Sequence, residues 1–290
     1  MGEPHYASRL PTSRKGWLHL LQQRGLRPRK ALGQHFLLDQ HIVQRIVQVA
    51  DVAPGDVVIE IGPGLGILTE ALLDAGAEVF AIELDKGLAA HLRATFGEVN
   101  RFHLIEGDAL KIDPASLVPA ERDYAVVANL PYSIASAVLM HLLEAEKPPR
   151  RLTIMVQREV AERLAAKPPA MTILGIAAQF FTTPRIAFVV PPDAFYPPPN
   201  VDSAVVVLDV RPCLPLPPEE RARFFRIVNA GFRHKRKQIA NSLADEFRVP
   251  KEAVVQWLTA AGIDPSRRAE TLSVEEWVKL TQHAPEWLKT

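Results

Sequence analysis

The chain has 290 residues, 48% of them hydrophobic and 23% charged, and its formal net charge at pH 7 is +1. This apolar content is enough for a large core and excludes a wholly disordered chain, while the length allows one large domain and a smaller one. The single cysteine, Cys213, excludes an intrachain disulfide and is typical of a reducing compartment, so we expect a cytoplasmic protein.

No stretch of the sequence has the pattern of a membrane span or of a secretory signal. The chain contains no run of 18 apolar residues, and its first 30 residues lack a continuous apolar segment. We therefore expect no membrane partner.

The first 30 residues form a basic extension. Residues 14–30 contain no acid and six cations, which are Arg14, Lys15, Arg24, Arg27, Arg29 and Lys30. Such a cluster can neutralise phosphates, although a solvated charged surface has the same composition. An organellar transit peptide is a third interpretation, but the basic stretch runs directly into sequence with the pattern of a folded domain.

From residue 57 to about residue 210, apolar runs alternate with segments of helical periodicity. We expect strands at Val57–Ile61, Glu78–Ile82, Phe102–Glu106, Tyr124–Ala128, Leu152–Val156, Ile186–Val190 and Ala204–Val210. We expect helices near residues 41–50, 67–75, 86–95, 134–145, 158–166 and 172–181. The alternation predicts an α/β fold with a seven-stranded sheet that has helices on both faces.

The connection between the last two predicted strands is rich in proline and contains no long helix. Prolines at positions 191, 192 and 197–199 punctuate it, and a β-branched run follows. This pattern predicts a hairpin-like, antiparallel edge strand, so we expect the sheet to be mixed.

A proline-rich linker at residues 211–218 separates the sheet from a helical C-terminal part. Beyond it, helical periodicity is present near residues 219–232, 235–247, 250–261 and 273–283. We therefore predict three parts, which are a basic extension at 1–30, an α/β domain at 31–212 and a small all-helical domain at 213–290.

Three predicted strands end in residues suited to binding a nucleoside. The first is followed by Gly62-Pro63-Gly64-Leu65-Gly66, whose glycines allow a ligand to approach the backbone at the start of a helix. Glu83 ends the second strand and can accept hydrogen bonds from ribose hydroxyls. Asp108, which follows the third strand, can accept a hydrogen bond from an adenine amino group.

Both a dinucleotide and S-adenosylmethionine fit such a pocket, and the residues around the glycines favour the second. The spacing is Gly62-x-Gly64-x-Gly66 rather than G-x-G-x-x-G. Glu60 lies two residues before the first glycine, where its carboxylate would repel a pyrophosphate but could accept from an ammonium or from backbone amides. We therefore expect S-adenosylmethionine as the cofactor, with Glu60, Gly62, Gly64, Glu83 and Asp108 in its site.

Asn129-Leu130-Pro131-Tyr132 follows the fourth predicted strand and points to a nucleobase amine as the methyl acceptor. The side-chain oxygen of Asn129 and the backbone carbonyl of Leu130 can accept both hydrogens of adenine N6, while Pro131 fixes the turn. Tyr132 can stack on a base that has left its helix. Phe195 is our candidate for stacking on the other face, with a core position as the alternative.

A second basic cluster, Arg233-His234-Lys235-Arg236-Lys237, is a candidate RNA-binding surface. We assign RNA binding to Arg233, Lys235, Arg236 and Lys237. We expect no metal site, because no two of the nine histidines are spaced H-x-x-x-H and one cysteine cannot form a thiolate cluster.

Several motifs, in the same order, resemble those of known methyltransferases. Residues 60–66, Glu83, Asp108 and 129–132 are similar to motifs of the class I adenine-N6 methyltransferases. The resemblance to the ribosomal RNA adenine dimethyltransferases, and in particular to their KsgA branch, rests on residues 32–37, 190–195, 197–204, 232–237 and 268–272. It covers about residues 25–285.

This resemblance implies a Rossmann-like domain, a helical C-terminal domain and dimethylation of two adjacent adenines in the 3′-terminal hairpin of 16S ribosomal RNA. The protein would act as a monomer on immature small ribosomal subunits. By position, the cofactor contacts would be His35, Leu37, Gly62, Glu83, Asp108 and Asn129. Many relatives carry asparagine in place of His35, and residues 171–175 depart from the usual pattern, which puts the role of that loop in doubt.

Three alternatives stay open. An Erm-type enzyme would methylate adenine N6 in 23S ribosomal RNA instead, although residues 201–204 and 268–270 favour the KsgA branch. A non-catalytic ribosome-assembly factor could use the same fold to bind RNA, but it would not need the intact motif at 129–132. A nicotinamide enzyme is the third alternative.

Overall fold

The computed structural model describes residues 9–29 and 33–288, so Lys30 of the basic extension and Leu32 of the 32–37 motif lie outside the described residues. The chain forms two compact units. The first contains the described residues of Met1–Ala161 and Pro184–Val210, and the second contains those of Glu162–Thr183 and Arg211–Thr290. The chain passes into the second unit near the predicted linker and does not leave it again, but the earlier segment 162–183 also belongs to that unit.

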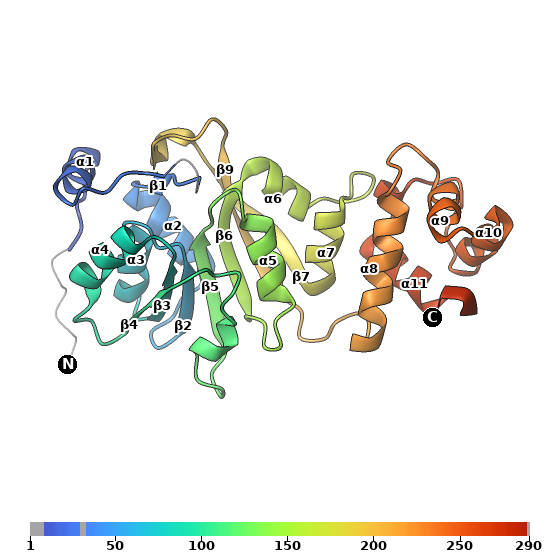
Figure 1. Cartoon of the computed structure of the whole chain (residues 1–290), viewed down its shortest axis with the longest axis horizontal. Helices are drawn as coiled ribbons and strands as arrows, with labels where there is room; N and C mark the ends of the chain where they lie inside the picture. The colour runs from blue at the N-terminus through green and yellow to red at the C-terminus, as the bar shows by residue number, and fades with distance from the viewer. Residues whose placement is uncertain (1–8, 30–32, 289–290) are drawn as a thin grey trace. The chain divides into compact units, whose positions relative to one another are not determined.

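A seven-stranded sheet with the order β4-β3-β2-β5-β6-β9-β7 forms the centre of the first unit (Figure 1). β2 to β6 run parallel to one another, whereas β9 is antiparallel to β6, so the α/β class and the mixed sheet are confirmed. All five residues of β2 are buried, because helices flank the sheet. The strands are β2 (Val57–Ile61), β3 (Glu78–Glu83), β4 (Phe102–Glu106), β5 (Tyr124–Asn129), β6 (Arg151–Gln157), β7 (Thr182–Val190) and β9 (Ser203–Val210).

The helices between these strands follow the predicted order. They are α2 (Gln40–Ala50), α3 (Ile67–Asp74), α4 (Lys86–Phe96), α5 (Ala135–Leu143) and α6 (Arg158–Leu164). The side chains of Asp39 and Asp85 cap the first turns of α2 and α4, because each carboxylate accepts from two backbone N–H groups that have no partner within the helix.

The expected edge position of the last strand is wrong. β9 is antiparallel, as predicted, but it lies between β6 and β7, which leaves β7 at the edge. Burial explains the difference, because the first six residues of β9 are buried and can lie only inside a sheet. β7 instead exposes Ile186 and Val189, as an edge strand can.

Two features of the first unit carry no clear sequence signal. A helix in the basic extension, α1 (Arg14–Gln23), begins at Ser13, whose hydroxyl accepts from the amide of Gly16. A second sheet consists of β1 (Phe36–Leu37) and β8 (Phe195–Tyr196), paired antiparallel. Two residues are too few to establish the alternation that predicts a strand.

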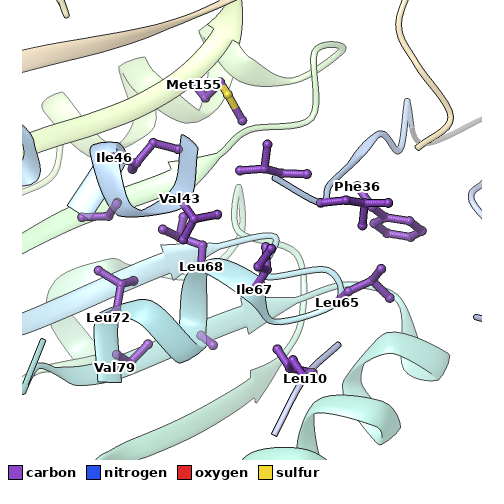
Figure 2. Packing of buried hydrophobic residues seen from close by; sticks show 14 of the residues in the cluster. Leu10, Phe36, Val43, Ile46, Leu65, Ile67, Leu68, Leu72, Val79 and Met155 are labelled. Atoms are coloured by element: carbon purple, nitrogen blue, oxygen red, sulfur yellow. The ribbon is translucent and has the colours of Figure 1, made fainter. Parts of the chain in front are cut away.

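The core of the first unit extends from the sheet to the glycine loop and the N-terminal segment. Figure 2 shows Leu65 of the loop and Phe36 of β1 in the same buried cluster as Val43 of α2 and Leu68 of α3. Leu10 of the N-terminal segment belongs to this cluster as well. Core packing therefore holds both the loop and β1 in place.

The second unit is helical, and aromatic rings fill its core. Its helices are α7 (Ile173–Phe181), α8 (Pro218–Phe232), α9 (Ile239–Phe247), α10 (Lys251–Ala260) and α11 (Val274–Gln282). Phe180 lies 4.6 Å from Phe224 between ring centroids, and Phe232 packs on Trp277. No helix in the described part of the chain has the length and apolar character to cross a bilayer.

Alanine at Gly231 tests the packing of α8 on α11. Alanine normally stabilises a helix by about 1 kcal/mol relative to glycine, but a Cβ on Gly231 would overlap the indole ring of Trp277. We expect Gly231→Ala to lower the free energy of unfolding by about 1–3 kcal/mol, measured by urea denaturation followed by circular dichroism. The control Asn229→Ala, exposed on the same helix, should be neutral or slightly stabilising. Equal stabilisation by both variants would contradict the close packing.

Candidate active site

A cavity of about 310 Å³ lies at the carboxyl ends of β2, β3, β4 and β5. Strand register explains why the four ends meet, because parallel pairing sets Ile61 beside Ile82 and Glu83 beside Glu106. The residues expected from the sequence that line this cavity are His35, Leu37, Glu60, Gly62, Gly64, Glu83, Asp108, Asn129, Leu130, Pro131 and Tyr132. The residues assigned to the cofactor and those assigned to the target base therefore share one cavity.

The glycine loop is held in a conformation that other residues rarely adopt. Gly62, Gly64 and Gly66 have φ angles of 67°, 60° and 85°. A Cβ on Gly66 would come within 2.6 Å of the Phe96 ring on α4. The loop therefore lies against α4, and the amide of Gly62 donates to the carbonyl of Ile82 on β3 at 2.9 Å.

Glu83 connects the glycine loop to the start of α4. One carboxylate oxygen accepts from the amide of Gly64 at 3.2 Å and the other from the amide of Asp85 at 2.8 Å. Burial raises the pKa of Glu83, although these backbone hydrogen bonds oppose the shift. Since a carboxylate has about four acceptor positions, Glu83 can still accept from a ligand hydroxyl.

Glu60 is a buried acid in the wall of the cavity. Its side chain is 1% exposed and accepts from the hydroxyl of Thr69 on α3 at 2.6 Å. Burial raises the pKa of Glu60 to about 8, the charge of Glu83 adds to the shift, and the Thr69 hydrogen bond opposes it. A cationic ligand in the cavity would favour the ionised form of this carboxyl.

Asp108 lies on the loop after β4, where one carboxylate oxygen accepts from the amide of Leu110 at 3.0 Å. This short-range bond fixes the turn and leaves the second oxygen for a ligand. Asp108 lines the same cavity as Glu60 and Glu83, so the cavity carries three acids and favours ligands with cationic or hydrogen-bond-donating groups.

The hydrogen bond between Asn129 and His35 orients the Asn129 amide. Its Nδ2 group donates to the backbone carbonyl of His35 at 3.3 Å, so the side-chain oxygen is directed away from that carbonyl and can accept from another group. The following turn contacts the glycine loop, because a Cβ on Gly62 would lie 3.7 Å from Cδ of Pro131.

Tyr132 is fixed at both its ring and its hydroxyl. Its ring stacks on that of His35 with a centroid distance of 5.5 Å and an interplanar angle of 27°. Its hydroxyl lies 2.6 Å from Oγ of Ser203 on β9, and Nδ1 of His35 donates to the carbonyl of Pro197 at 2.7 Å. Ser203 was missed as a site residue, since a serine at a strand start gives no sequence signal for a tyrosine 71 positions away.

Phe195 does not line the cavity, which corrects our expectation that it stacks on a base. Its side chain is 0% exposed and belongs to the core cluster of the first unit. Pairing of β8 with β1 sets Phe195 beside Leu37, so the ring supports the cavity wall from the core. This is the core position that we considered as the alternative.

The predicted RNA-binding cluster in the second unit falls between α8 and α9 instead of starting a helix. Two of its four assigned cations are engaged, since Lys237 pairs with Asp245 at 2.7 Å and Arg233 with Glu246 at 3.8 Å. Lys235 and Arg236 are exposed and form no ion pair with the described residues. Across residues 9–29 and 33–288, no group of three or more His, Cys, Asp or Glu side chains could hold a metal ion.

Comparison with known proteins gives consistent matches over most of the chain. The model of a family described as "Ribosomal RNA adenine dimethylase" matches residues 25–285. Proteins named "Ribosomal RNA small subunit methyltransferase A" from Dehalococcoides mccartyi and Moorella thermoacetica are 45% and 42% identical, covering 88% and 91% of this chain and 88% and 95% of their own length.

Solved structures agree with these matches. The 23S rRNA methyltransferase ErmE is 27% identical with a TM-score of 0.70, and the match covers 86% of this chain and 98% of that one. A dimethyladenosine transferase from Plasmodium falciparum is 26% identical with a TM-score of 0.71, over 85% of this chain and 96% of that one.

Glutamine at Glu60 tests the burial of this carboxyl, because glutamine keeps an acceptor for Thr69 but does not ionise. The pKa of Glu60 is raised from 4.5 to about 8 by folding, so unfolding releases a proton between these two values. The stability contribution of Glu60 is therefore complete below pH 4.5 and is lost as the pH rises toward 8. The loss is at most about 5 kcal/mol at about 1.36 kcal/mol per pKa unit.

Urea unfolding at several pH values should show this loss in the unaltered chain and a flatter pH profile in Glu60→Gln. The control Glu98→Gln, at an exposed position, should keep the profile of the unaltered chain. Parallel profiles for Glu60→Gln and the unaltered chain would show that Glu60 ionises normally in the fold.

Proposed function

We propose that this chain, which belongs to the ribosomal RNA adenine dimethylase family, transfers methyl groups from S-adenosylmethionine to N6 of two adjacent adenines in the 3′-terminal hairpin of 16S ribosomal RNA during small-subunit maturation. The observation that carries the proposal is the single cavity that contains both the glycine loop and the turn at 129–132. A methyl donor and an amine acceptor must meet in one such space.

The residues of the cavity fit S-adenosylmethionine. Its sulfonium and ammonium groups are cationic, and Glu60 and Glu83 are buried acids whose charged forms a cation would stabilise. Glu83 and the second oxygen of Asp108 are suited to the ribose hydroxyls and the adenine amino group of the donor. A pyrophosphate does not fit three acids, which disfavours a nicotinamide dinucleotide. When bound, the donor supplies an electrophilic methyl group.

The chain's own part in the reaction is to hold and shape the target amine. The N6 lone pair of adenine is delocalised into the ring, which makes this nitrogen a weak nucleophile. We assign the side-chain oxygen of Asn129 and the backbone carbonyl of Leu130 as acceptors for its hydrogens, which pulls the nitrogen toward a tetrahedral geometry and frees its lone pair from conjugation with the ring. Positioning of this kind can supply up to about 7–11 kcal/mol of the barrier reduction.

A base inside an RNA helix cannot reach this turn and must first leave its stack. Tyr132 is the proposed stacking surface, because it lines the cavity and its ring is held by His35 and Ser203. Stacking on an aromatic ring contributes about 1–3 kcal/mol per base. We propose Lys235 and Arg236 as the main phosphate contacts of the 233–237 cluster, since neither forms an ion pair within the described part of the chain.

The relatives support the small-subunit substrate over the alternatives. Curated relatives that are 45% and 42% identical are named for the small subunit, whereas ErmE, named for 23S RNA, is 27% identical. Action as a monomer, on immature subunits and in the cytoplasm, is part of the same proposal. Transfer of labelled methyl groups to immature small subunits tests it, with primer extension to map the adenines. Labelling of 23S RNA would support the Erm-type alternative, and no transfer would support an assembly factor.

Alanine at Asn129 should abolish turnover while cofactor affinity changes by less than about tenfold, or ~1.4 kcal/mol. The amide is needed to shape the acceptor nitrogen, whereas the donor has several other contacts in the cavity. Labelled-methyl transfer and calorimetric titration with S-adenosylmethionine give the two readouts. Ser133→Ala, also in the cavity wall, is the control and should keep turnover. A parallel collapse of affinity and turnover in Asn129→Ala would argue against the assigned role.

Glutamine at both Lys235 and Arg236 should weaken RNA binding and flatten its salt dependence. Each lost phosphate contact reduces the slope of log K against log salt by about 0.7–0.9. The matched pair Arg233→Gln and Lys237→Gln should have a smaller effect, because those cations already pair with Glu246 and Asp245. Binding of a labelled RNA hairpin at several salt concentrations measures both. An unchanged slope in the variant with glutamine at Lys235 and Arg236 would show that these two cations form only a solvated charged surface.

A further inference from the structure

The N-terminal segment 9–29 is a folded part of the first unit. Leu10, Trp17 and Leu21 are buried in its core, and Trp17 is 0% exposed. The family match begins at residue 25, after the end of α1. The position of α1 is set by its own contacts with the unit.

Four polar contacts, made by three arginines, fasten this segment to the rest of the unit. The guanidinium of Arg14 donates to the carbonyls of Asp193 and Phe195 at 2.8 and 3.3 Å. The amide of Arg9 donates to the Glu70 carboxylate at 2.7 Å, and Arg29 pairs with the buried Asp85 at 2.8 Å. Arg14 and Arg29 are thus used as anchors.

The other cations of the segment have no such task. Lys15, Arg24 and Arg27 are exposed and form no ion pair with the described residues. No acid occurs anywhere between residues 9 and 29 to balance them. The charge of Arg24 extends to His91 on α4, where it adds to the effect of burial in lowering the pKa of that histidine. The segment therefore presents three exposed cations, without ion-pair partners among the described residues, on a fixed backbone.

Both anchors connect to the wall of the cavity. Phe195, which accepts from Arg14, pairs across the small sheet with Leu37, and Leu37 lines the cavity. Asp85, which pairs with Arg29, donates its amide to Glu83 in the same wall. The segment that carries the exposed cations is therefore fastened to the wall of the cavity within the same unit.

We propose that Lys15, Arg24 and Arg27 form a phosphate-binding surface for the substrate RNA, in addition to the 233–237 cluster. Lys15 and Arg24 are nine positions apart, which is about 14 Å along a helix and about half a turn around it, so they would contact different phosphates of a polyanion. An anionic membrane fits less well, because the apolar side of α1 is already buried through Trp17 and Leu21. The inference rests on the proposed function, since it assumes an RNA substrate.

The test replaces Lys15, Arg24 and Arg27 by glutamine in the full chain and keeps the anchors Arg14 and Arg29. Binding to a labelled RNA hairpin with adjacent loop adenines is measured from about 50 to about 200 mM salt. We expect binding to weaken by about tenfold or more at low salt and the log–log slope to fall by about 2–3. Calorimetric binding of S-adenosylmethionine should be unchanged, which shows that the fold and the cavity are intact.

A charge-matched control variant has glutamine at Arg185, Lys251 and Lys279, which are all exposed on other elements. Its slope of log K against log salt should equal that of the unaltered chain. If the slope becomes flatter by the same amount in both triple variants, the effect comes from net charge alone, and the proposed surface is overturned. An unchanged slope in the first variant, or lost binding to anionic vesicles alone, would also overturn it. Failure of the unaltered chain to methylate RNA would instead count against the proposed function, so the two failures can be told apart.

Discussion

The parallel pairing of β2 with β5 is the constraint on which the site depends. Val57 pairs with Tyr124 and Ile59 with Val126, and the same register carried three residues further sets Gly62 beside Asn129. The glycine loop, which would bend around the methyl donor, and the turn at 129–132, which would hold the acceptor, therefore begin at the same level of two neighbouring strands. Pairing of β2 with β3 adds Glu83 on the other side of the glycine loop. Backbone hydrogen bonds, more than side-chain contacts, set the distances across the cavity.

The sequence predicted those parts of the fold and site that depend on local pattern. The strands that lead into Gly62, Glu83, Asp108 and Asn129 could be recognised because apolar runs and polar ends lie next to each other in the chain. The position of β9 inside the sheet could not be predicted, since it depends on which strand pairs with its outer edge. Phe195 and Ser203 were misjudged or missed for the same reason, as their neighbours are distant in sequence.

The cavity concentrates acids at a cost in stability. Burial raises the pKa of both Glu60 and Glu83, so the fold holds these carboxyls in conditions that disfavour their charge. The glycine loop adds three glycines, which lose more backbone freedom on folding than other residues. Core packing of Leu65 and Phe36, in the cluster of Figure 2, offsets this cost. Such local conflicts between stability and arrangement are typical of functional sites.

The double restraint on Tyr132 has a consequence for processivity. The Tyr132 ring stacks on the imidazole of His35, and its hydroxyl is hydrogen-bonded to Ser203, so the ring is held in place. In the proposed reaction, the nucleotide therefore has to change its own conformation between the first and the second methylation. A monomethylated adenine has a single N6 hydrogen left, and its methylamino group must turn about the C6–N6 bond to present the lone pair again. The pause between the two products would then be governed by rotation of that group.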